Sequence, residues 1–213
     1  MPERILTALL LLFVSTALYA EQQVIEHQIS FENRKNQYVD VKLTIPVHSS
    51  TVDLAMPNWT PGSYLIRDYA AHVESLQARG HSGKVLPVSK IEKNRWRIEA
   101  AGEQQIEVTY ALWAGELAVN AAWIEADFAM LNGAAVFLYN ENTRHLPQLL
   151  QIELPETWHN VHVALPRADS TSTYFARDYD ELVDSPVLLG NTTSYPFTVD
   201  GQDYVLVNQG DAA

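Results

Sequence analysis

Apolar and polar residues alternate along most of this chain with a period of two. In residues 38–46, YVDVKLTIP, every second residue from Val39 to Ile45 is apolar and those between are polar or charged. Residues 104–113, QQIEVTYALW, repeat the pattern. Further strand-length runs are QQVIEHQISF, NRWRIEA, AAVFLY, LLQIELP, NVHVALP, YPFTVD and DYVLVN. Runs of this length, bounded by Pro, Gly, Asn or Asp, predict an all-β antiparallel β-sandwich of about ten or more short strands.

Long amphipathic helices are not indicated. The segment DYDELVDSP predicts one short helical turn over Asp178–Asp184, and its acidic residues are expected to be solvated.

Residues 1–20 have the layout of a secretory signal peptide. A charged start at Arg4 is followed by an apolar run from Ile5 to about Val14 and then by the segment Ser15 to Ala20. We expect cleavage near Ala20, which leaves a single β-sandwich domain over residues 21–213 in a periplasmic or extracellular protein. The alternative is an N-terminal anchor helix that stays in place.

Composition narrows the function classes. The chain has 213 residues, of which 47% are hydrophobic, and a formal net charge of −12. That charge argues against nucleic-acid binding, which needs a basic surface to neutralise phosphates. The chain has no cysteine, so an exported domain has to be held by its hydrophobic core alone.

The sequence shows no recognisable catalytic centre. None of the seven histidines is followed by Glu, so the H-E-x-x-H motif of zinc peptidases is not present. His159 and His162 are three apart in a predicted strand, and would point to opposite faces. We therefore expect the chain to have no enzymatic activity of its own.

One short segment, MPNWTPGSYLIRDYAAHVESL, combines turn residues with aromatic and charged residues. Pro61 and Gly62 suit the two central positions of a type II turn. Turn chemistry does not explain the side chains around them. The candidate functional residues of this segment are Trp59, Pro61, Gly62, Ser63, Tyr64, Arg67 and Asp68.

The same segment resembles a signature of the glycyl aminopeptidase family, metallopeptidase family sixty-one. That signature reads W-x-P-G-S-Y-x-I-R-(D/E), and NWTPGSYLIRDYAAHV matches it. The similarity continues in order along the chain through KIEKNRWRI, IEVTYALWA, NGAAVFLY, LPETW and DYDELVDSPVLLG.

The resemblance implies an architecture and a role. Members of the family have an N-terminal β-domain, then a helical domain that carries the zinc ligands, and often a PDZ domain. This chain resembles the N-terminal domain alone, so zinc is expected only in the catalytic domain that it lacks. The resemblance implies a non-catalytic accessory domain that packs against, or shapes the cleft of, a catalytic domain or chain.

Two interpretations of the signature loop remain open. In the first, Trp59 and Tyr64 are buried in a corner of the core and Arg67 pairs with a carboxylate to fix the loop. In the second, the loop meets the catalytic domain, Arg67 holds a carboxylate across that junction, and an apolar patch is exposed. The alternative function is a free-standing exported module that binds a glycan or protein, with Trp113 and Trp123 exposed to stack on a sugar.

Overall fold

The computed structural model describes residues 23–168 and 172–210. The predicted signal peptide over residues 1–20, with its helix, lies outside the described residues. Within them, no helix is long and apolar enough to cross a membrane.

The largest element is a seven-stranded sheet with the order β13-β11-β1-β2-β8-β4-β5. Its strands are β1 (Ile25–Ser30), β2 (Tyr38–Pro46), β4 (Val73–Gly80), β5 (Val85–Leu86), β8 (Gln105–Trp113), β11 (Gln148–Glu153) and β13 (Thr173–Ala176). All its pairs are antiparallel except β1–β11, which is parallel because the long intervening chain returns to the same end of the sheet.

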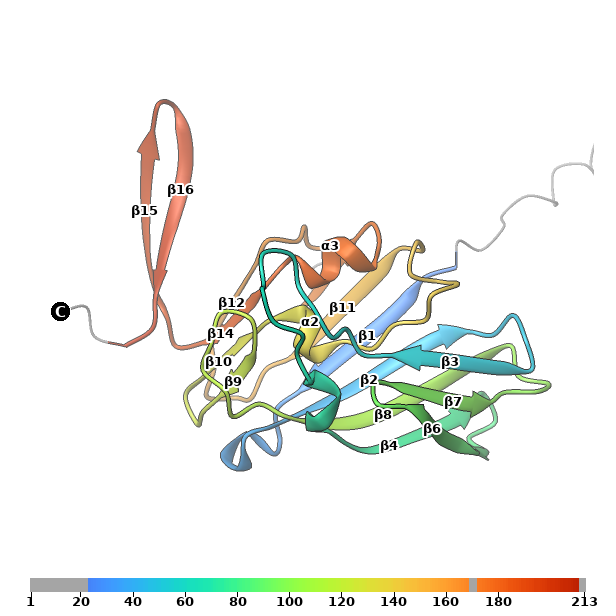
Figure 1. Cartoon of the computed structure of the whole chain (residues 1–213). Helices are drawn as coiled ribbons and strands as arrows, with labels where there is room; N and C mark the ends of the chain where they lie inside the picture. Colours follow the sequence, from blue (N-terminus) through green and yellow to red (C-terminus); the bar gives the residue numbers. More distant parts are fainter. Residues whose placement is uncertain (1–22, 169–171, 211–213) are drawn as a thin grey trace, which may run out of the picture.

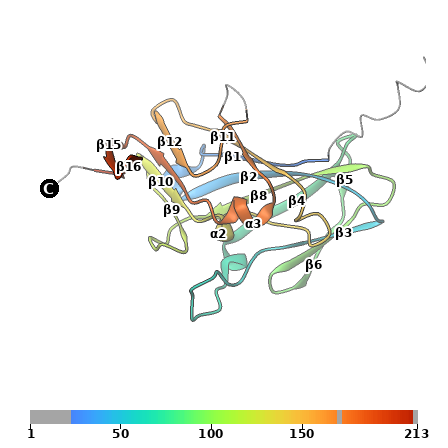
Figure 2. The same cartoon turned by 90° about the horizontal axis from the view of Figure 1, so that it is seen from above.

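Two smaller sheets complete the layered body. One has the order β3-β7-β6 and the other β12-β14-β10-β9. Their strands are β3 (Thr51–Ala55), β6 (Val88–Glu92), β7 (Arg95–Glu99), β9 (Ala122–Ile124), β10 (Phe128–Leu131), β12 (Asn160–Val163) and β14 (Val187–Gly190). The three-stranded sheet lies across one face of the long sheet, and the four-stranded sheet lies towards one end (Figure 1, Figure 2).

The predicted alternation decides which face of the long sheet is buried. In β2 every second residue, from Val39 to Ile45, is buried, and the residues between are half-buried. Their cross-strand neighbours on β8 include Tyr110 opposite Val41 and Val108 opposite Leu43, which are also buried. The prediction of an all-β sandwich is confirmed, and its core lies between the long sheet and the two smaller ones.

The helical elements are short. The turn predicted over Asp178–Asp184 is confirmed as α3 (Tyr179–Val183), and the Asp178 side chain caps it by accepting from the Glu181 backbone N–H. Two 3-10 turns, η1 (Arg34–Asn36) and η2 (Tyr69–His72), precede β2 and β4.

The prediction of a strand over AAVFLY is wrong. Its first residues form the single-turn helix α2 (Gly133–Val136), capped by the Asn132 side chain. All four helical residues and the following Phe137 are buried. An apolar run that is buried on every side carries no period, so the pattern could not distinguish a helical turn from a strand.

The last two strands form a separate hairpin. β15 (Thr193–Val199) pairs with β16 (Gln202–Asn208) in an antiparallel ribbon. The ribbon projects away from the layered body (Figure 1).

Candidate interdomain surface

The signature loop connects β3 to η2, and its central turn has the predicted type. The Ser63 backbone N–H donates to the Thr60 carbonyl over 3.1 Å, and Gly62 has a φ of +85°. A type II turn requires a positive φ at its third residue, which explains the glycine. The Trp59 indole N–H donates to the Ser63 carbonyl over 2.8 Å and closes the turn from the side.

The base of the loop is fixed by backbone hydrogen bonds. The Arg67 N–H donates to the Asn58 carbonyl over 2.7 Å, which joins the two arms of the loop. At the start of the loop, Asn94 from the β6–β7 turn holds Met56 in two ways. Its side-chain amide donates to the Met56 carbonyl over 2.7 Å, and its own carbonyl accepts from the Met56 N–H over 3.0 Å.

Arg67 and Asp68 each contact a different neighbouring turn. With the Asn120 amide oxygen facing the guanidinium, Arg67 donates to it from Nε and a terminal nitrogen over 3.0 and 2.6 Å. Asp68 pairs with Lys93 over 2.6 Å in an exposed ion pair. The interpretation that Arg67 pairs with a carboxylate of its own domain to fix the loop is wrong, because its partner there is the uncharged amide of Asn120.

The large apolar side chains of the loop remain in solvent. Trp59 is 47% exposed, Tyr64 is 103% exposed and Ile66 is 74% exposed. Burial of Trp59 and Tyr64 in a corner of the core is therefore wrong. Exposed apolar residues on the neighbouring loop flank Asn120, where the two loops meet. We call this set the loop patch: Trp59, Tyr64, Leu65, Ile66, Leu117 and Val119.

The tryptophans considered for glycan stacking are half-buried. Trp113 packs edge-to-face on His72, with ring centroids 5.1 Å apart. The Trp123 indole N–H donates to Glu125. Rings in these positions are not an exposed flat pair, which weakens the binding-module alternative.

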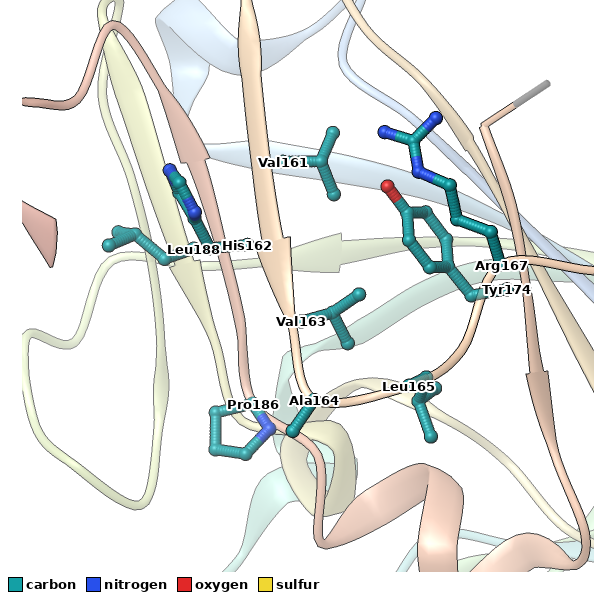
Figure 3. Close-up of a pocket in the computed structure, with 9 residues that line it drawn as sticks. All are labelled: Val161, His162, Val163, Ala164, Leu165, Arg167, Tyr174, Pro186 and Leu188. Atoms are coloured by element: carbon teal, nitrogen blue, oxygen red, sulfur yellow. The ribbon is translucent and has the colours of Figure 1, made fainter. Parts of the chain in front are cut away.

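An open depression of about 560 Å³ lies beside the edge strand β12, and none of the predicted site residues lines it (Figure 3). The Arg167 guanidinium lies over the Tyr174 ring at 5.6 Å. His162 points away from Val163, and its Nε2 is 2.8 Å from the Thr192 hydroxyl. The described residues that line the depression include no carboxylate.

The zinc that the family resemblance implies has no fitting ligand set in residues 23–168 and 172–210. No three His, Asp or Glu side chains there lie close enough together to hold a metal ion. No catalytic step through zinc follows from these residues.

Sequence reasoning selected the loop but missed the residues that hold it. Asn94 and Asn120 lie in other turns, and no local pattern distinguishes them from ordinary turn asparagines. Lys93 lies in the segment KIEKNRWRI, which resembles the family, but the sequence does not indicate that Lys93 pairs with Asp68. The segment's two lysines contact the loop and the core, since Lys93 pairs with Asp68 and Lys90 lies over the Trp96 ring at 4.8 Å.

Comparison with solved structures gives a strong similarity to a longer protein. An aminopeptidase N family protein from Idiomarina loihiensis is 32% identical to this chain with a TM-score of 0.83, over 88% of this chain and 32% of that one. This chain thus spans about a third of that relative's length.

Other similarities are more distant. An M1 zinc metallopeptidase from Deinococcus radiodurans has 12% identity and a TM-score of 0.47, over 83% of this chain and 43% of that one. Yeast LTA4 hydrolase has 12% identity and a TM-score of 0.45, over 82% and 29%. These two are too remote to support an argument about function. No curated protein matches the chain.

The family itself is shown by the sequence. Residues 26–191 match the family described as Peptidase M61 N-terminal domain. The match covers well over half of the chain and includes all the strands of the layered body except the first residue of β1. The chain therefore belongs to the Peptidase M61 family, of which it carries the N-terminal domain.

Proposed function

We propose that this chain is the non-catalytic N-terminal accessory domain of an exported aminopeptidase-like metallopeptidase, and that the loop patch packs against the catalytic domain and borders its cleft. One observation carries the proposal. The backbone of the signature loop is tied down by hydrogen bonds at both ends, while its largest apolar side chains stay in solvent.

Such an arrangement favours binding. An exposed group of large apolar residues marks an interaction site more often than an ordinary surface. A loop that is already fixed loses little conformational entropy when it docks, so more of the contact energy appears as affinity. Fully burying a side chain such as Ile66 or Leu65 contributes about 1.5–3 kcal/mol.

The candidate residues of the signature loop have different roles in forming this surface. Pro61, Gly62 and Ser63 form the turn that presents Tyr64. Trp59 braces that turn through its indole N–H and offers its exposed ring to a partner. Arg67 and Asp68 position the loop through Asn120 and Lys93.

Catalysis in the proposed enzyme belongs to the partner domain, together with its zinc. The described residues of this chain form no ligand set for zinc, so they cannot lower the pKa of a metal-bound water. We expect the purified chain to hydrolyse neither glycyl nor alanyl anilides, with or without added zinc. Zinc-dependent turnover that a chelator abolishes, in a preparation free of contaminants, would contradict this.

A binding measurement tests the accessory role. The partner is the portion of the Idiomarina loihiensis protein that this chain does not cover, expressed separately. Calorimetry should show that the wild-type chain binds it, and that Ile66→Ser weakens binding by about 1–3 kcal/mol. The matched control is Val85→Ser, because Val85 is 58% exposed on β5, outside the loop patch.

Equal effects of the two substitutions would remove the loop patch from the interface. A partner that is folded, as circular dichroism can show, and still does not bind the wild-type chain would contradict the accessory role itself.

A further inference from the structure

The depression beside β12 lies where the outer edges of two sheets meet. β12 is the outermost strand of the four-stranded sheet, and β13 is the outermost strand of the seven-stranded sheet. The chain that follows β12 runs back along β13. The Ala168 N–H donates to the Thr173 carbonyl over 2.9 Å. The Phe175 N–H donates to the Pro166 carbonyl, also over 2.9 Å, so this segment covers the edge of β13.

The outer edge of β12 borders the depression. β12 pairs with β14 on one side, from Asn160 opposite Gly190 to Val163 opposite Val187. Every second residue of an antiparallel strand directs its N–H and C=O away from the paired strand. No hydrogen bond from another described residue reaches these outward backbone groups of residues 160–163. Such an edge can accept a further strand.

The wall of the depression next to β12 is apolar. Val161 and Val163 point from the strand towards Tyr174 (Figure 3). His162, between them, points to the other side of the strand. The volume of about 560 Å³ lies within the range of about 300–1,000 Å³ that is usual for ligand sites. The space beside the strand therefore suits an apolar group.

Tyr174 contributes a buried hydroxyl to the depression. Its side chain is 3% exposed, and the hydroxyl has no hydrogen-bond partner among the described residues. Figure 3 shows the hydroxyl directed to the side on which Val161 and the Arg167 guanidinium lie. A buried polar group without a partner is costly, which favours a bound group that supplies one.

Arg167 places a positive charge beside the Tyr174 ring. Its guanidinium lies 5.6 Å from the ring centroid and forms no ion pair or hydrogen bond with another described residue. The Arg167 side chain is exposed, so it can rotate off the ring and uncover the hydroxyl. A guanidinium and a phenol hydroxyl are donors that one carboxylate can satisfy together, since it accepts through both oxygens.

The C-terminus of a peptide combines the groups that these features would bind. Its backbone can pair with β12, its last side chain can pack on Val161 and Val163, and its carboxylate can accept from Arg167 and Tyr174. A free carboxylic acid could use the apolar wall and the donors but would leave the strand edge unpaired. The strand edge therefore favours a peptide.

We infer that the depression beside β12 binds the C-terminal residues of an extended peptide chain that ends in an apolar residue. The peptide adds a strand to the edge of β12, and its terminal carboxylate binds Arg167 and the Tyr174 hydroxyl. The lining residues lie outside the loop patch, and the inference does not depend on the accessory role.

NMR titration of the isotope-labelled chain tests the inference. The probes are six-residue peptides that share a body of serine and threonine and differ only in the C-terminal residue, which is varied over all amino acids. Peptides that end in valine, isoleucine or leucine should bind most tightly and shift the amide signals of residues 160–163. Amidation of the valine peptide should weaken its binding about tenfold, because the amide lacks the charge.

Two substitutions test the donors. Tyr174→Phe removes only the hydroxyl, which has no partner among the described residues, so the urea midpoint should not change. Affinity for the valine peptide should fall about tenfold. Arg167→Gln should weaken binding of the valine peptide about tenfold and of its amide less than about twofold. The matched control is Arg177→Gln, which removes the same charge just after β13, outside the depression, and should change binding less than about twofold.

Methylation of single peptide amides tests the strand pairing. Only every second N–H of an added strand faces β12. Methylation at alternate positions should therefore weaken binding about tenfold, and methylation at the positions between should change it little.

Four results would overturn the inference. In the first, none of the peptides shifts the signals of residues 160–163 at millimolar concentration. In the second, the valine peptide and its amide bind equally well. In the third, 3-methylbutanoate binds as tightly as the valine peptide, which would assign the site to a free acid. In the fourth, Tyr174→Phe lowers the urea midpoint strongly, which would mean that the hydroxyl is bonded within the fold.

Discussion

Arg67 donates two hydrogen bonds, over 3.0 and 2.6 Å, to the side-chain oxygen of Asn120, and this contact joins the signature loop to the loop before β9. Arg67 is half-buried, and the partner of its guanidinium is uncharged. Arg67 therefore stabilises the fold of this domain by holding the two loops together, independently of any contact in a complex.

Arg67→Ala should destabilise the isolated domain by about 1–2 kcal/mol, because hydrogen bonds from a charged donor are worth about 1.5–3 kcal/mol and partial exposure reduces that. Urea denaturation measures the change. Asn120→Ala should have a similar effect, and the double variant should lose little more than either single one. Additive losses would show that the two side chains act independently.

Tyr110→Phe should destabilise the core by about 2–3 kcal/mol, since it leaves two buried backbone groups without a partner. The Tyr110 hydroxyl donates to the Val136 carbonyl over 2.7 Å and accepts from the Leu138 N–H over 3.2 Å. Tyr179→Phe is the matched control. The Tyr179 hydroxyl makes one such bond, to the Phe137 carbonyl over 2.7 Å, so its loss should be about 1–2 kcal/mol. Denaturant unfolding that ranks the two variants in the opposite order would contradict this assignment.

His27 should make the domain less stable in mild acid. Burial lowers the pKa of His27 to about 4, although a hydrogen bond to Gln148 raises it in part. An unfolded histidine has a pKa of about 6.5, so between pH 6.5 and 4 only the unfolded state takes up this proton. The free energy of unfolding should therefore fall by about 3 kcal/mol across that window, and no further below it.

The measurement compares urea denaturation of the wild type and His27→Leu at several pH values between 4 and 7. The variant should lose this part of the pH dependence, whereas the carboxylates contribute equally to both proteins. Parallel curves for the two proteins would mean that His27 has the same pKa in the folded and unfolded states, which would contradict the prediction.

Export should remove the first twenty residues. If the run from Ile5 to Val14 is a signal sequence, the secreted protein begins near Glu21, and intact mass spectrometry of the exported fraction would show that mass. Intact Met1 in a membrane fraction would instead support the anchor helix.

The sequence by itself determined part of the strands, among them β2 and β8, and their buried faces. The side chains of a strand alternate with a period of two, so the apolar residues of β2 and β8 could lie only on one face, and that face became the core. Pro61 and Gly62 determined the turn in the same local way, because φ preferences belong to the residues themselves. The family motif identified the domain and the loop.

Tertiary structure alone decided what surrounds these elements. It made a helical turn of Gly133–Val136, where an added Cβ at Gly133 would lie 2.7 Å from Val183, so the close approach of α2 to α3 requires glycine. It placed Asn120 against Arg67 and left Trp59 and Tyr64 in solvent. Burial and hydrogen-bond partners depend on which distant segments come together, and a local pattern carries no information about that distance in space.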